Sequence, residues 1–83
     1  MSGLTLYHRP GCHLCEQMLG AIYGTYGDEV EVALVDIDKD PALKTRYGTR
    51  VPVLMGGGQV ICEAQLDIPA LDAYFHRVAG LGQ

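Results

Sequence analysis

Two cysteines separated by two residues, Cys12-His13-Leu14-Cys15, stand between a short apolar run and a longer periodic one. Residues 4–8 are compatible with a β-strand, Arg9-Pro10-Gly11 is typical of a turn, and the pattern from Cys12 onward predicts a helix. A cysteine that opens a helix lies beside unpaired backbone N–H groups and the positive end of the helix dipole. Its thiol should therefore ionise more easily than a free one, which makes Cys12 the candidate nucleophile.

Cys15 follows Cys12 by three positions, on the same face of the predicted helix and one turn deeper. At this spacing the two sulfur atoms are within reach of each other, so the pair predicts a reversible dithiol with Cys12 and Cys15 as catalytic residues. If His13 is protonated beside Cys12, it would further stabilise the thiolate and make the disulfide a better oxidant. The alternative is a His13 side chain that points to solvent and has no such role.

Two further segments follow the first helix. Its apolar stripe ends in a turn at Gly27 and Asp28, and residues 30–37 are rich in β-branched residues, which predicts a strand. The middle of that strand, residues 32–35, is apolar on both faces, as expected for a strand that is covered on both sides. The stripe itself consists of Leu14, Met18, Ile22 and Tyr26, with Cys15 and Leu19 alongside.

The second half of the chain predicts a short helix over 41–47, capped by Asp40, then two apolar runs, 49–55 and 59–63, around a glycine turn. A last helix begins after Asp67 and ends at Gly80. The expected fold is α/β, with the order β-α-β-α-β-β-α and a four-stranded mixed sheet that has helices on both faces. The first two strands should be parallel, and the hairpin should add antiparallel strands.

Size and charge narrow the class of protein. With 83 residues the chain has room for one domain, 1–83, and it carries a net charge of −4, which argues against nucleic acid or an anionic membrane as partner. No apolar run approaches the ~20 residues that span a bilayer, and residues 1–3 do not resemble a secretory signal. Three cysteines, an odd number with two of them close together, do not predict a structural disulfide framework. We therefore expect a cytoplasmic protein that acts as a monomer.

The sequence resembles the thioredoxin superfamily, and in particular its glutaredoxin branch, over residues 4–79. The resemblance rests on the Cys-x-x-Cys at the start of the first helix, on Arg9, and on the later run Arg50-Val51-Pro52. It implies a cis bond before Pro52, with this proline lying against the cysteines and the backbone of Val51 pairing with a bound peptide or with glutathione. It also implies a small thiol–disulfide oxidoreductase that acts in cell redox homeostasis.

That enzyme would reduce protein disulfides or glutathione mixed disulfides without a bound cofactor, and glutathione or a thioredoxin-type reductase would regenerate it. Arg9 and Arg50 could attract an anionic substrate group such as a glutathione carboxylate, or they could be solvated charges. The chain departs from the usual glutaredoxin pattern in two places. It has His13-Leu14 where Pro-Tyr is usual, and residues 61–67 lack the Gly-Gly pair that holds glutathione.

Two other classes of function use the same cysteines. One is a metal or iron–sulfur module, because thiolates are soft ligands, although the spacing of His8, His13 and Cys62 is not that of a zinc finger. The other is a binding domain without redox chemistry. Cys62 falls in an apolar strand, where a free cysteine commonly behaves as a small buried hydrophobic residue, and the alternative for it is a further redox thiol.

Overall fold

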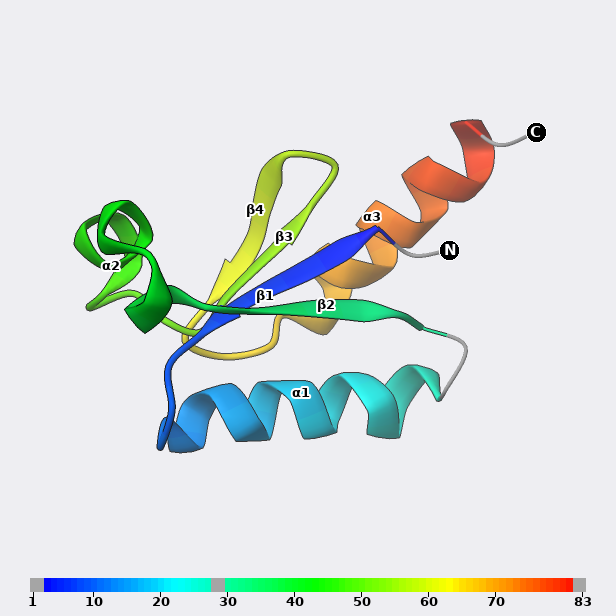
Figure 1. Ribbon diagram of the computed structural model, residues 1–83. Coiled ribbons are helices and arrows are strands. Elements are labelled where there is room, and N and C mark those ends of the chain that lie inside the picture. The colour runs from blue at the N-terminus through cyan, green and yellow to red at the C-terminus, as the bar shows by residue number, and fades with distance from the viewer. Residues whose placement is uncertain (1–2, 28–29, 82–83) are drawn as a thin grey trace.

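The computed structural model describes residues 3–27 and 30–81, with side chains given as far as residue 78. Both the order and the types of the predicted elements are confirmed, and a short 3₁₀ helix is added to them (Figure 1). The elements are β1 (Leu4–His8), α1 (His13–Tyr26), β2 (Val32–Asp36), η1 (Ile37–Lys39), α2 (Pro41–Tyr47), β3 (Val53–Gly56), β4 (Gln59–Glu63) and α3 (Ile68–Leu81).

The four strands form one mixed sheet in the order β2-β1-β3-β4. β1 and β2 are parallel, whereas β3 is antiparallel to both β1 and β4, as the sequence predicts. The hairpin between β3 and β4 turns at Gly57 and Gly58, whose φ angles are +59° and +79°. Glycine adopts such angles at little cost, which explains the glycine run at this turn.

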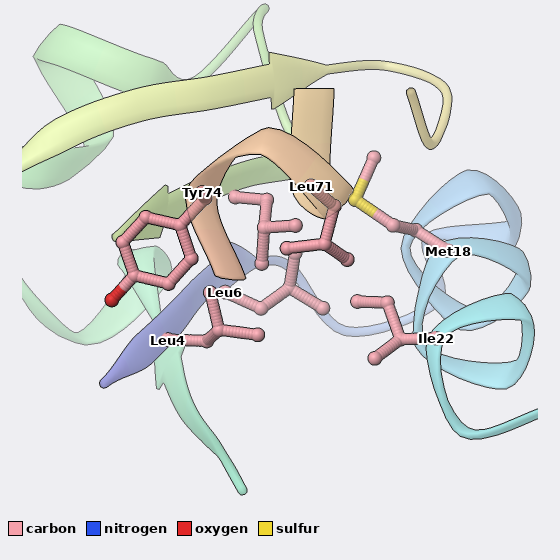
Figure 2. Close-up of a cluster of buried hydrophobic side chains, with 7 residues drawn as sticks. Leu4, Leu6, Met18, Ile22, Leu71 and Tyr74 are labelled. Atoms are coloured by element: carbon pink, nitrogen blue, oxygen red, sulfur yellow. The ribbon is translucent and has the colours of Figure 1, made fainter. Parts of the chain in front are cut away.

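One face of the sheet is covered by α1 and α3. Met18 and Ile22 of α1 pack with Leu6 of β1 and Leu71 of α3 in the main hydrophobic cluster (Figure 2). These four side chains are almost entirely buried. Since Ile22 lies in the middle of α1, this packing fixes the helix that carries both cysteines.

The opposite face of the sheet is covered by α2 and η1. Ile37 of η1, Tyr47 of α2 and Val53 of β3 form a second buried cluster, and the rings of Tyr7 and Tyr47 stack with their centroids 4.7 Å apart. Alternate residues of β1 therefore face different clusters, as expected for a central strand. Helices on both faces of the sheet are thus confirmed.

β2 is not covered on both sides, and this expectation from the sequence was wrong. It forms an edge of the sheet, its residue Ala33 is exposed, and the Leu34 side chain is 53% exposed. An apolar strand is buried on both faces only when helices cover both faces and strands flank it on both sides. The position of a strand within the sheet cannot be predicted from the residues of that strand alone. β2 therefore presents an apolar residue at the rim of the molecule.

Three smaller expectations also differ from the structure. The predicted polar turn after β2 contains η1 with the buried Ile37, and the third strand begins only at Val53, because the backbone of Arg50 and Val51 closes the end of α2. Leu14, placed in the apolar stripe of α1, is 44% exposed, because Cys15, Met18 and Ile22 form the buried face of the helix. The predicted turn residue Asp28 lies outside the described residues.

Candidate active site

A tight turn connects β1 to α1 and sets the position of Cys12. The Cys12 N–H donates a hydrogen bond to the Arg9 carbonyl oxygen at 3.3 Å, and Gly11 has a φ angle of +74°. Only glycine adopts this conformation readily, as the third residue of such a turn requires. The turn places Cys12 directly before α1, so that Cys12 is the N-cap residue of this helix.

The two cysteines occupy different environments in the same helical turn. Cys12 is partly exposed, whereas the Cys15 side chain is only 5% exposed. Their sulfur atoms lie at disulfide distance and their Cα atoms are 5.2 Å apart. The Cys12 Sγ also accepts a hydrogen bond from the Cys15 N–H at 3.1 Å. An N–H group of the first helical turn therefore points at the sulfur that the sequence predicts as the nucleophile.

His13 points away from the protein. Its Nδ1 lies 3.9 Å from the Glu16 Oε2, and both side chains are largely exposed. Such a contact between exposed groups contributes little, because water and salt screen it. His13 is therefore adjacent to Cys12 in the chain, but it is bound to its helical neighbour rather than to the sulfur.

Arg9 is held by an ion pair rather than left open to a ligand. Its Nε donates to the Asp38 Oδ1 at 2.9 Å, and its Nη1 lies 3.5 Å from the Gly48 carbonyl oxygen. Both contacts join the turn before Cys12 to the η1–α2 side of the molecule. The guanidinium charge is thus compensated locally, and a carboxylate ligand would have to compete with Asp38 for it.

Arg50 is engaged more strongly than Arg9. Its Nε and Nη2 donate to the two carboxylate oxygens of Glu63 at 2.7 and 2.9 Å, and its guanidinium lies 5.3 Å from the centroid of the Tyr47 ring. The hydrogen bond lowers the pKa of Glu63 and raises that of Arg50. The structure therefore does not bring Arg9 and Arg50 together as a free positive patch beside the cysteines.

The Val51–Pro52 peptide bond is cis, and Pro52 is buried. Tyr7, near the end of β1, pairs with Val53, the first residue of β3. Pro52 therefore lies at the same end of these two strands as the turn that leads to Cys12. The Pro52 carbonyl oxygen accepts from the Ala64 N–H at 2.9 Å, and the Val51 N–H donates to the Tyr47 carbonyl oxygen at 3.1 Å. The N–H of Val51 is thus already used within the chain.

A hollow of about 270 Å³ opens beside the two cysteines. The turn 9–12 and Cys15 line one part of it, and the remaining lining comes from β1, α1 and β2. These further residues were not predicted from the sequence. Leu34, for example, reaches the site only through the strand register that pairs it with Leu6. The further residues are Leu6, His8, Glu16, Leu19 and Leu34.

Cys62 does not belong to this hollow. It is half-buried on β4 against the main hydrophobic cluster and lines a separate, shallow hollow near the start of α3. Burial raises the pKa of its thiol, which leaves less thiolate near neutral pH. This environment agrees with the small buried hydrophobic residue that its strand position predicts.

In residues 3–27 and 30–81, no three His, Cys, Asp or Glu side chains gather in a group that could hold a metal ion. Over the same residues, no helix has the length and apolar character needed to cross a bilayer.

Comparison with known proteins places this geometry in a family. The model of the glutaredoxin-like domain (DUF836) matches residues 3–76. The X-ray structure of target protein XcR50 from X. campestris is 39% identical, with a TM-score of 0.74, and the match covers 89% of this chain and 96% of that one.

The solution structure of protein Ne2328 from Nitrosomonas europaea is 32% identical, also with a TM-score of 0.74, over 88% of this chain and 89% of the other. No curated protein matches the sequence. The family match spans nearly the whole described chain and includes the turn, the helix start and the cis-proline segment. The chain is therefore a member of the glutaredoxin-like domain family (DUF836), and it has the fold of that family.

Proposed function

We propose that this protein is a thiol–disulfide oxidoreductase that uses Cys12 and Cys15 to reduce disulfides in other proteins or in glutathione adducts. One observation carries the proposal: an accessible cysteine caps a helix, accepts an N–H hydrogen bond on its sulfur, and has a buried second cysteine at disulfide distance. The family assignment is consistent with a redox role.

The difference in exposure between Cys12 and Cys15 supports the following order of the two steps. The Cys12 thiolate attacks one sulfur of the substrate disulfide, and the other sulfur leaves as a thiolate and takes up a proton. The product is a mixed disulfide between Cys12 and the substrate. Cys15 then loses its proton and attacks the Cys12 sulfur, so the substrate leaves as a thiol and the enzyme holds the Cys12–Cys15 disulfide. Two electrons have passed from the enzyme dithiol to the substrate.

The chain's own backbone supplies the stabilisation that these steps need. The Cys15 N–H, which donates to the Cys12 Sγ, would stabilise the negative charge on that sulfur before it attacks the substrate disulfide. Pro52 would bound the site on the side of β3, and the Val51 carbonyl group is proposed to meet the substrate backbone.

The remaining parts of the reaction cycle follow from thiol chemistry. Glutathione or a thioredoxin-type reductase would return the oxidised pair to the dithiol, and no bound cofactor is required. The proposed enzyme acts as a monomer, because both exchanging sulfur atoms come from one chain. Its proposed setting is the cytoplasm, where the thiol pool keeps such a dithiol reduced.

A reductase assay tests this function. With dithiothreitol as electron source and a protein disulfide as substrate, we expect the wild-type protein to reduce many equivalents of substrate faster than dithiothreitol alone. The double variant Cys12→Ser/Cys15→Ser, which keeps Cys62, should give only the background rate. A wild-type rate equal to that background would refute the proposed activity.

A further inference from the structure

The hollow beside the cysteines has an apolar floor. Leu6 and Leu19 form its inner part, and Leu34 stands at its rim on the edge strand β2. Leu6 is almost fully buried, but its strand partner Leu34 remains 53% exposed. An apolar side chain that entered the hollow would cover the exposed surface of Leu34, and removal of this surface from water favours binding.

His8, Arg9 and Glu16 are the His, Arg and Glu side chains on the lining of the hollow, and the arginine and the glutamate do not favour an anionic substrate side chain. Arg9 is the arginine on its lining, and this guanidinium is already paired with Asp38. Glu16 adds a carboxylate to the same lining, one helical position beyond Cys15. The other arginine predicted for the site, Arg50, is held by Glu63. An acidic group placed here would meet the Glu16 carboxylate, with no unpaired guanidinium from Arg9 or Arg50 to compensate it.

From these two observations we infer that the hollow is a substrate subsite for a protein segment with an apolar residue beside its reactive cysteine. The segment carries no acidic residue at that position. This inference rests on the proposed function and narrows its substrate class: disulfides in polypeptides of this kind are preferred over the anionic glutathione adduct. Cys12 lines the subsite, so a side chain seated against Leu34 belongs to a residue close to the sulfur under attack.

Three mixed disulfides of the chromogenic thiol 5-thio-2-nitrobenzoate test the preference. Two are short peptides with capped ends and no other charged residue, which differ only in having leucine or aspartate next to the cysteine, and the third is glutathione. The Cys12 thiolate of the reduced protein attacks the peptide or glutathione sulfur, and the coloured thiolate leaves. The second-order rate constant for its release reports how well each segment fits beside Cys12.

We expect the wild-type protein to react about tenfold faster with the leucine peptide than with the aspartate peptide or glutathione, which corresponds to partial burial of one large apolar side chain. Leu34→Asn should remove most of this advantage by slowing the leucine peptide alone. Glu16→Gln should raise the rate with the aspartate peptide a few-fold relative to the rate with the leucine peptide. Val60→Asn is the matched control, because Val60 is 43% exposed on the opposite edge strand, β4, away from the hollow.

The possible failures are distinct. Equal rates for the three compounds, or a leucine preference that survives in Leu34→Asn, would overturn the subsite while leaving the proposed activity intact. No reaction of the wild-type protein with any of the three would overturn the proposed activity and the subsite together.

Discussion

Replacement of Cys15 by serine is expected to stop the reaction at its midpoint, with Cys12 covalently bound to the substrate. The partly exposed Cys12 is retained in this variant, so attack on the disulfide proceeds, but the buried sulfur that resolves the mixed disulfide is absent. Mass spectrometry after denaturation in acid should show one substrate per protein, bonded to Cys12. Turnover of protein disulfides should fall to the background rate of thiol exchange, whereas a substrate that external glutathione can release would still turn over.

Cys12→Ser is the matched comparison, and it should give neither an adduct nor turnover. A serine hydroxyl at this position remains protonated near neutral pH and does not attack disulfides. The assignment would be wrong if Cys12→Ser kept its activity, or if Cys15→Ser were trapped through Cys62 rather than through Cys12. Because Cys62 is present in both variants, the site of the adduct separates these cases directly.

Truncation of Ile22 should produce the second large effect, a loss of stability. Ile22 is fully buried between α1 and the sheet, so Ile22→Ala removes buried methyl groups and leaves a cavity. Changes of this kind cost about 2–5 kcal/mol, and Ile22→Val costs about 0.5–1.5 kcal/mol. The free energy of unfolding from urea titration measures both, and the valine variant keeps the comparison possible if the alanine variant does not fold.

Leu14→Ala provides a control in the same helix. Leu14 is 44% exposed, so its truncation removes less buried surface and should cost about 1 kcal/mol or less. If Leu14→Ala and Ile22→Ala had equal effects, the packing of α1 described above would be incorrect. Cys12 caps α1 and Cys15 lies within it. Loss of the packing of Ile22 should therefore also lower the yield of active protein at raised temperature.

The parts of the fold that depend on local signals could be predicted from the sequence. Asp40 before Pro41 marks the start of α2, and the Asp40 Oδ1 accepts from the Ala42 N–H as an N-cap does. The Asp67 Oδ1 caps α3 in the same manner through the Ala70 N–H. The position of the cysteine pair at the start of α1 could be predicted as well. The turn before the pair and the helical pattern after it are both short-range features of the sequence.

Features that depend on neighbours distant in the sequence could not be predicted. The apolar run 32–35 is compatible with a central strand and with an edge strand. Only the strand order shows that β2 forms an edge of the sheet and exposes Leu34. Arg9 and Arg50 belong to two segments that the resemblance places near the cysteines, but Asp38 and Glu63, which neutralise them, lie 29 and 13 positions away from them. Both guanidinium groups, which could have formed a positive patch near the cysteines, are therefore paired with carboxylates in the folded chain.

Equilibration of the purified, metal-free protein in graded dithiothreitol or glutathione redox buffers tests the central claim most directly. After alkylation of the remaining thiols, mass spectrometry scores the Cys12–Cys15 disulfide and the state of Cys62 separately. We predict one two-electron transition between about −300 and −120 mV, the range of known dithiol oxidoreductases. Cys62 should be alkylated throughout. The claim that Cys12 and Cys15 form a redox-active dithiol would be contradicted by a different result. In that result no Cys12–Cys15 disulfide forms across this range, and added iron or zinc binds through both cysteines.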